Sequence, residues 1–293
     1  VSVDTADTEL ADEVHGVIVA IGNTARFYSY QIMNLHEVVN ETIGDEKIAI
    51  THCSLCRSSL VFNRVLDGQE LNFEISGQVY NNNTLLQDRE TGSLWLQASG
   101  LAISGKLIGS QLEIIPAQVM TWGDFKNSFP VAEALSTNTG FERDYNRHPY
   151  LAYDGSEVIY FPLTSTDGRI TNKWLVNGIS INGEHMAFAE RIIFGSRVQH
   201  ETVGGEEVLA LYDAETGVTS VLKPYNSSGD LLAFNYDFEE ESFMDETGTS
   251  WTAFGLAIDG PLAGERLEQI AAPDMFWFCW SALHPDTRIS EID

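Results

Sequence analysis

Positive charge is scarce in this sequence. Its 293 residues include 16 Lys and Arg against 43 Asp and Glu, which gives a formal net charge of −27. Because phosphate binding needs clustered cations, we expect no nucleic-acid partner. The acidic residues are spread along the chain and form no blocks, which is typical of a strongly hydrated surface suited to salty or extracellular conditions.

Long apolar runs are also lacking. No segment reaches the roughly 18 apolar residues needed to cross a bilayer, so we expect no membrane span. The chain starts at Val1, with neither an initiator Met nor the pattern of a signal peptide, and we interpret it as a mature or trimmed product. A hydrophobic content of 43% with only 8 Pro is typical of a globular protein, and the length suggests two domains.

The familiar catalytic motifs are missing as well. The sequence contains no phosphate-binding loop, dinucleotide fingerprint, nucleophile elbow or His-Glu-x-x-His. Acidic residues abound, but no pair of them stands out as an acid and base couple. Hydrolase chemistry therefore has little support, and the sequence identifies no catalytic residue.

The strongest positive feature is an internal repeat. Residues 100–130 align without gaps on residues 255–285, with 14 of 31 positions identical, where chance would give about 2. Two shorter matches lie upstream, 90–95 with 246–251 and 41–46 with 201–206. Because each copy has the size of a domain, we predict a tandem duplication that forms two related lobes.

The pattern within a copy is mainly that of strands. Val17 to Tyr28 reads as a hairpin around Gly22-Asn23, and further strands are predicted at 47–51, 59–63 and 71–75. Short helices are predicted at 30–39 and 122–129. The predicted fold class is mainly β with a minor α content, in two pseudo-symmetric β-rich lobes. The predicted boundaries are 1–137 for the first repeat, 138–174 for a linker or cleft-covering segment, and 175–293 for the second repeat.

The sequence Thr-His-Cys-Ser-Leu-Cys at residues 51–56 carries a resemblance to a known family. Together with 34–37, 88–95, 259–264, 276–280 and 284–287, it resembles the prokaryotic family called domain of unknown function 3179 over nearly the whole chain. The family pattern has Cys-Pro-Leu-Cys, usually after an aromatic residue. Here Ser54 and His52 occupy those places, which makes His52 a poor candidate for a shared role. The resemblance implies an extracytoplasmic protein, periplasmic or extracellular, and implies no activity.

The two copies differ at the residues that carry metal or redox chemistry. Cys53 and Cys56 form a Cys-x-x-Cys, with His36 and His52 before Cys53. When the two copies are aligned at an offset of 160, His36 aligns with Ser196 and His52 with Tyr212. Cys53 aligns with Asp213 and Cys56 with Thr216. A purely structural role in a shared fold would not require this asymmetry.

The cysteine pair predicts a metal site. Two sulfurs on a tight turn can share one ion, and thiolates with imidazole select zinc, copper or iron. We predict one transition-metal ion held by Cys53, Cys56 and His36, and an oxidising setting favours copper over zinc or iron. Weaker candidate ligands are His52, His148 and Met33. The predicted function is metal binding or electron transfer, and enzymatic activity is left open.

Two alternatives stay open for the same cysteines. Cys53 and Cys56 could form the redox pair of a thiol-disulfide oxidoreductase, although no helix follows them as it does in thioredoxin-like folds. They could also form a structural disulfide in a surface or assembly protein whose second lobe is an interaction module. Cys279 lies among aromatic residues and is interpreted as a small buried hydrophobe. The tryptophans Trp95 and Trp251, at equivalent places of the two copies, are predicted to lie in the core.

Overall fold

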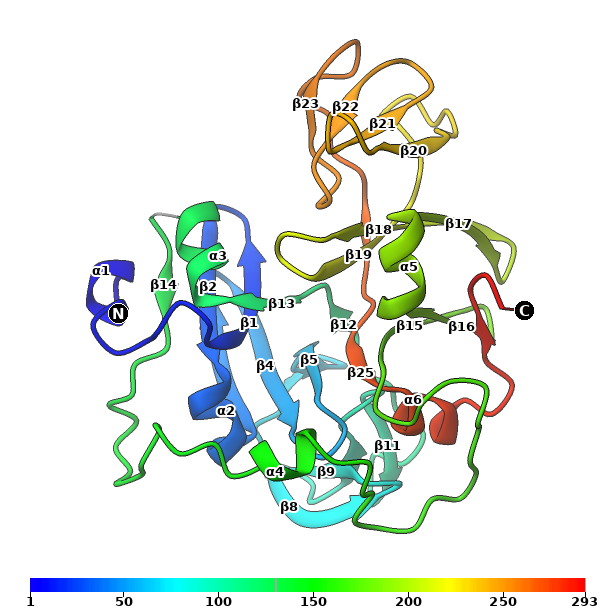
Figure 1. Cartoon of the computed structure of the whole chain (residues 1–293). Coiled ribbons are helices and arrows are strands. Elements are labelled where there is room, and N and C mark those ends of the chain that lie inside the picture. Colours follow the sequence, from blue (N-terminus) through cyan, green and yellow to red (C-terminus); the bar gives the residue numbers. More distant parts are fainter. Residues whose placement is uncertain (130, 293) are drawn as a thin grey trace. The chain divides into compact units, whose positions relative to one another are not determined.

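The computed structural model describes residues 1–129 and 131–292 and is mainly β, as predicted, with 43% strand and 12% helix. The chain divides into two compact units (Figure 1). The first unit contains residues 1–173 and 273–283, and the second contains residues 174–272 and those from 284 onward. Most of the predicted linker, 138–173, therefore belongs to the first unit, as does a stretch of the second sequence copy.

Three small sheets form the first unit, antiparallel except where β14 pairs with β2. The first sheet has the order β13 (Gln118–Thr121), β1 (His15–Ile21), β2 (Thr24–Ser29) and β14 (Glu133–Ala134). The second has the order β12 (Ile114–Ile115), β5 (Ser58–Asn63), β4 (Glu46–Cys53) and β3 (Val38–Ile43). The third has the order β11 (Leu101–Ser104), β10 (Leu94–Leu96), β9 (Asn83–Asp88) and β8 (Phe73–Tyr80).

The remaining elements of the first unit are short. Two further strands, β6 (Val65–Leu66) and β7 (Gln69–Glu70), pair as a ribbon, and β25 (Asp274–Phe276) contacts β5. The helices are α1 (Val3–Ala6), α2 (Tyr30–His36), α3 (Trp122–Ser128), α4 (Leu151–Asp154) and α6 (Trp277–Leu283). None of the helices in the described ranges has the length and hydropathy that a membrane crossing requires.

The predicted hairpin at 17–28 is confirmed. β1 and β2 pair from Gly16↔Ser29 to Ile21↔Thr24, and Gly22 has a φ of 58° that suits its place in the turn. The helix predicted at 30–39 ends earlier, at His36, because Glu37 adopts a left-handed φ of 58° and turns the chain into β3. The β-branched residues after this cap extend the second sheet instead of the helix.

The second unit repeats the order of elements seen in the first. One sheet contains β15 (Leu175–Ile181), β16 (Glu184–Ala189) and β26 (Arg288–Ile289), and the helix is α5 (Glu190–Ser196). The next sheet has the order β17 (Val198–Val203), β18 (Glu206–Asp213), β19 (Val218–Leu222) and β24 (Gln269–Ile270). The last has the order β20 (Phe234–Asp237), β21 (Ser242–Asp245), β22 (Ser250–Trp251) and β23 (Ala257–Asp259). The order of elements agrees between the units, while the origin of both by duplication stays a prediction.

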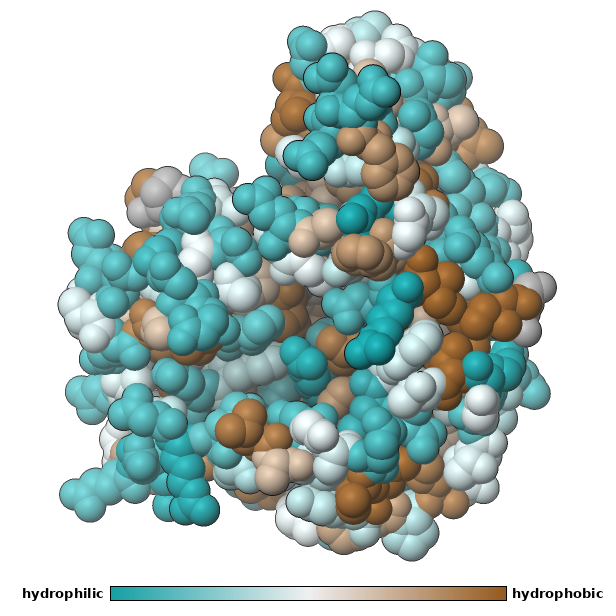
Figure 2. Space-filling model, viewed as in Figure 1, coloured by the Kyte–Doolittle hydropathy of each residue, from teal (hydrophilic) through white to brown (hydrophobic). Residues whose placement is uncertain are grey.

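Each unit has its own hydrophobic core, and the two predicted core tryptophans are buried. In the first unit, side chains from β1, β2, α2, β4 and β5 form one cluster; β15, β16, α5, β18 and β19 form a similar one in the second. Trp95 donates its indole N–H to Asp88 at 2.8 Å, and Trp251 donates to Asp245 at 2.9 Å. The paired indole N–H explains how both rings are buried without losing a hydrogen bond. On the face shown in Figure 2 hydrophilic residues predominate, as the acidic composition suggests.

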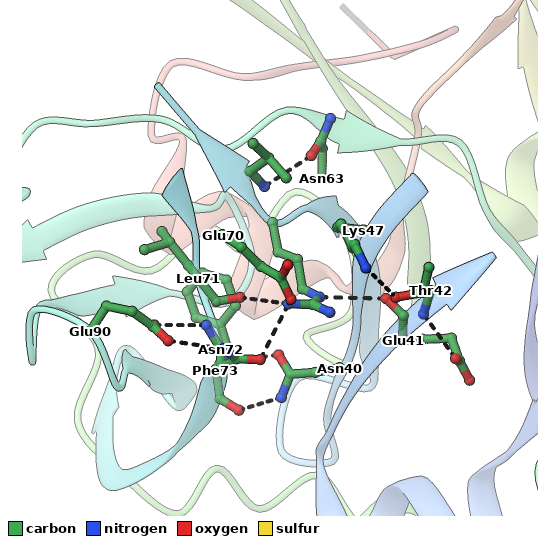
Figure 3. Close-up of polar contacts among 12 residues, drawn as sticks. Asn40, Glu41, Thr42, Lys47, Asn63, Glu70, Leu71, Asn72, Phe73 and Glu90 are labelled. Carbon is green, nitrogen blue, oxygen red and sulfur yellow. Dashed lines mark hydrogen bonds and ion pairs between the residues drawn. The ribbon is translucent and has the colours of Figure 1, made fainter. Parts of the chain in front are cut away.

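A buried arginine joins three segments of the first unit, and Figure 3 labels its partners Glu41, Glu70, Leu71 and Asn72. Arg64 is only 5% exposed and follows β5 directly. Its guanidinium donates to the backbone oxygens of Glu41 and Leu71 at 3.4 and 3.2 Å, to Asn72 at 3.2 Å, and to the Glu70 carboxylate. These partners come from β3, from β7 and from the chain before β8, so one side chain joins three segments.

Replacing Arg64 by Met should lower the free energy of unfolding of the first unit by about 3 kcal/mol, because it leaves buried acceptors without a donor. The control is Arg89→Ala, which removes an exposed cation paired with Glu74 at 2.9 Å. That change should cost less than about 1 kcal/mol. Urea unfolding followed by tryptophan fluorescence measures both variants, and equal losses would contradict the role given to Arg64.

Candidate functional site

The three cysteines are arranged differently from the sequence-based interpretation. Cys56 forms a disulfide with Cys279, 223 residues further along the chain, and Cys53 is a free thiol with 0% exposure. Cys279 is therefore a bonded residue and not merely a small buried hydrophobe. Cys53 and Cys56 are not bonded to each other, so neither a Cys53–Cys56 redox disulfide nor a structural disulfide between them is present.

The predicted metal ligands do not form a group. The Cys56 sulfur is bonded to Cys279, and His36 Nε2 lies 2.7 Å from the Tyr145 hydroxyl. Within residues 1–129 and 131–292, no three His, Cys, Asp or Glu side chains are placed to hold an ion. Sequence proximity suggested convergence, but the left-handed cap after α2 and the partner from residues 138–174 give His36 another contact. Binding of copper, zinc or iron stays a prediction.

The weaker candidate ligands also have other contacts. Met33 is fully buried in the core of the first unit. The Tyr150 backbone N–H donates to His148 Nδ1 at 3.2 Å, and His148 Nε2 lies 3.5 Å from Asp154 Oδ2. Both ring nitrogens of His52 have hydrogen-bond partners inside the protein. None of these three side chains joins the cysteines.

A pocket of about 330 Å³ lies in the first unit beside the Cys-x-x-Cys turn. Its walls come from residues 13–15, from α2, from the turn that joins β4 to β5, and from residues 145–154. Ser54 and Arg57 of the turn line the pocket, and the two cysteines lie beside them in the chain. The volume is that of a site for a small molecule.

A chain of hydrogen bonds lies under the pocket, with His52 at its centre. Burial, with a smaller effect of the Arg57 charge, lowers the pKa of His52 to about 3, so its ring is neutral at physiological pH. His52 Nε2 donates to Asn34 Oδ1 at 3.0 Å, since that oxygen only accepts, and Nδ1 accepts from Ser59 at 2.9 Å. The Tyr30 hydroxyl therefore donates to Ser59 at 3.0 Å.

Asn34 is the last residue of this hydrogen-bond network and presents a donor to the pocket. The side chain is 7% exposed and lines the pocket. Its Oδ1 accepts from His52 and also from the Ser54 hydroxyl at 2.9 Å. These two bonds fix the amide so that Nδ2 is left as the group with unused hydrogens. Among the described residues, none accepts a hydrogen bond from Asn34 Nδ2.

Arg57 presents a second set of donors to the same pocket. Its side chain is half-buried, and no residue in the described part of the chain accepts a hydrogen bond from it or forms an ion pair with it. Its charge helps to lower the pKa of His15 and of His52, which line the same pocket. The pocket thus contains a cation that is not paired directly with a carboxylate of the described residues.

The backbone of Arg57 is also unusual. Arg57 ends the four-residue turn between Cys53↔Ser58 of β4 and β5, and its φ is 50°. In the second unit Gly217 ends the corresponding turn between Asp213↔Val218, with a φ of 69°. Glycine occupies this left-handed region without strain, and arginine does not. The first unit thus has a cation at a position whose backbone favours glycine, and the strand connection itself does not require arginine there.

Acidic groups also reach the pocket. Glu13 and Asp154 line it, and burial raises the pKa of Asp154 while His148 and Arg57 oppose that rise. Because His148 Nδ1 accepts a backbone N–H, the ring donates from Nε2 toward Asp154 and has no free lone pair for proton abstraction. In this arrangement the His148 ring is not placed to act as a general base.

Comparison with known proteins identifies the family. The pattern described as Protein of unknown function (DUF3179) matches residues 1–287, which is nearly the whole chain. No curated protein and no solved structure matches the chain.

Proposed function

The chain belongs to the DUF3179 family, and from the geometry of its first unit we propose that it binds a small anion in the pocket beside α2 and the β4–β5 turn. The ligand carries a carboxylate or another oxyanion group. One observation carries this proposal: the pocket is lined by Asn34 Nδ2 and the Arg57 guanidinium, which are buried or half-buried donors for which the described residues supply no acceptor, and the exposed Arg147 lines the same pocket.

The donors favour an acceptor-rich ligand. A guanidinium has five N–H groups in a planar fork that matches a carboxylate or phosphate, and it accepts nothing. Asn34 is held by His52 and Ser54, so its N–H groups are in place before a ligand arrives. Such preorganisation reduces the entropy lost on binding. An anion would supply acceptors to both side chains and compensate the charge of Arg57.

The asymmetry between the two units supports a site confined to the first. At the offset of 160, Asn34 falls opposite Phe194 and Arg57 opposite Gly217. The second unit has a helix and a turn in the same order, but neither donor. The donor pair is therefore not required by the arrangement of strands.

The expected location is an extension of this proposal. The Cys56–Cys279 disulfide would persist in an oxidising compartment, and the acidic surface suits a salty or extracellular medium. We therefore place the binding function outside the cytoplasm, in the periplasm or beyond it. Cell fractionation followed by detection of the native protein with an antibody tests this placement.

Isothermal titration calorimetry with three probes tests the binding function. Succinate and inorganic phosphate should each bind with one site per chain, while succinamide, a neutral analogue of succinate, should not. Arg57→Ala should weaken binding at least about 30-fold, as loss of a desolvated charge partner costs about 2 to 5 kcal/mol or more. Asn34→Asp, which replaces the donor with a negative charge, should abolish it.

The control for net charge is Arg89→Ala, because Arg89 pairs with Glu74 at a surface away from the pocket. It should change the affinity less than threefold, since an exposed charge at a distance is screened by salt. If neither anion binds at millimolar concentration, or if Arg57→Ala and Arg89→Ala weaken binding equally, the proposed function is wrong.

A further inference from the structure

The sulfur atoms of all three cysteines lie in the first unit. Cys53 ends β4, Cys56 is three residues further along the turn, and Cys279 of α6 is bonded to Cys56. The Cys53 sulfur accepts the backbone N–H of Thr84 at 3.3 Å, and the nearby backbone N–H groups of Leu55 and Cys56 favour its thiolate form. The Cys53 sulfur therefore lies close to the backbone of the turn that carries Cys56.

The carbonyl groups of two consecutive residues contact the sulfurs of Cys53 and Cys279. The Cys53 thiol donates to the Asn82 carbonyl at 3.5 Å, and the Cys279 sulfur lies 3.8 Å from the Asn81 carbonyl. Neighbouring residues are only about 3.8 Å apart from Cα to Cα, so the free thiol and the disulfide lie under the same short piece of chain. Both asparagines have left-handed backbones and are buried.

We propose that Cys53 is the nucleophile of an internal thiol-disulfide exchange. The Cys53 thiolate attacks the Cys56 sulfur, the Cys56–Cys279 bond breaks, and a Cys53–Cys56 disulfide forms. Cys279 leaves as a thiolate and takes up a proton in place of the one that Cys53 gave up. The number of disulfides is unchanged, so the step needs no oxidant or reductant.

The exchange would change what the disulfide constrains. In the isomer seen here, the bond ties the segment 273–283 to the β4–β5 turn. After exchange that segment keeps non-covalent contacts, among them the hydrogen bonds from Phe276 N to Cys56 O at 2.8 Å and from Phe278 N to Asn172 O at 2.9 Å. The exchange is thus a switch between a covalently tied and an untied α6.

The same step would act on the wall of the pocket, since Ser54 and Arg57 belong to the turn that carries both cysteines. Burial, with Glu37 nearby, raises the pKa of the Cys53 thiol, while the backbone N–H groups of Cys56 and Thr84 favour the thiolate. The thiol is therefore protected from solvent but placed beside one sulfur that it can attack. Burial of the thiol beside the disulfide favours internal exchange over reaction with an external disulfide.

Mapping of the free thiol tests the exchange in the native full-length chain. The protein is incubated without reductant at pH 8.5, quenched with acid, denatured and alkylated with N-ethylmaleimide at pH 6.5. Mass spectrometry of the peptides then locates the label. The label should move with time from Cys53 to Cys279, together with the appearance of a Cys53–Cys56 cross-link. A label that stays on Cys53, or moves to Cys56, overturns the proposal.

Two variants sharpen this test. Cys53→Ser should keep only the Cys56–Cys279 bond and show no labelled thiol at any time. Cys279→Ser should form a Cys53–Cys56 disulfide in a glutathione redox buffer, which leaves no thiol that reacts with Ellman's reagent in denaturant. Retention of two thiols in Cys279→Ser would show that the sulfurs cannot reach each other. Neither measurement depends on a ligand in the pocket.

Discussion

Removing the disulfide with Cys56→Ser and Cys279→Ser together should lower the free energy of unfolding by about 5 kcal/mol when both units unfold. The bond joins residues 223 positions apart, and closing so long a loop restricts the unfolded chain far more than closing a short one. The loss should appear as a lower urea midpoint in circular dichroism. Dithiothreitol should produce a similar shift in the wild type.

The matched control is Cys53→Ala, which removes a buried sulfur but leaves the disulfide in place. It should cost about 1 to 2 kcal/mol from lost packing and the contacts with Asn82 and Thr84. Dithiothreitol should still shift the midpoint of this variant. If the double serine variant is no less stable than Cys53→Ala, the long-range bond does not stabilise the fold.

The local part of the fold could be predicted from the sequence. The hairpin at 17–28 follows from a Gly-Asn turn between β-favouring runs, and pairing confirms it. The burial of Trp95 and Trp251 follows from their equivalent places in the two copies. These features depend on neighbours in the chain or on internal comparison, and both are visible in one sequence.

Long-range partners could not be predicted in the same way. The spacing of Cys53 and Cys56 shows that their sulfurs can approach, but not that Cys56 bonds to a residue 223 positions away. His36 was grouped with the cysteines because it precedes their strand. Its imidazole contacts Tyr145, which belongs to the segment 138–174 that the sequence indicated as a linker or a cover for a cleft, without showing which residues it contacts. Contacts such as Cys56–Cys279 and His36–Tyr145 depend on the tertiary packing of segments that are far apart in the sequence.

The donors of the pocket were missed for a different reason. Asn34 and Arg57 match no motif, and a hydrogen-bond donor without a partner is a property of the folded chain. A signal was nevertheless present, because the comparison at an offset of 160 sets Asn34 against Phe194 and Arg57 against Gly217. Amide and guanidinium groups carry no metal or redox chemistry, so these two differences did not indicate a metal or redox site.

The stability of the first unit should fall steeply between pH 6.5 and pH 3 because of His52. Its pKa is about 3 in the folded protein, against about 6.5 in an unfolded chain. Above pH 6.5 the ring is neutral in both states, and its contribution to stability is complete. As the pH falls below 6.5 the unfolded state binds a proton that the folded state excludes, so stability declines by about 2 kcal/mol by pH 5.

Urea unfolding of the wild type and of His52→Gln at pH 7, 6 and 5 measures this contribution. Glutamine can donate to Asn34 and accept from Ser59 as the neutral ring does, but it does not titrate in this range. The difference in stability between the two proteins should therefore shrink, or reverse in favour of the variant, as the pH falls. Burial and the nearby His185 also lower the pKa of His284, to about 4, which adds a decline of the same sign in the second unit. Both proteins retain His284, so its contribution cancels in the difference. If plots of unfolding free energy against pH stay parallel for wild type and His52→Gln from pH 7 to 5, His52 is not held neutral by the fold.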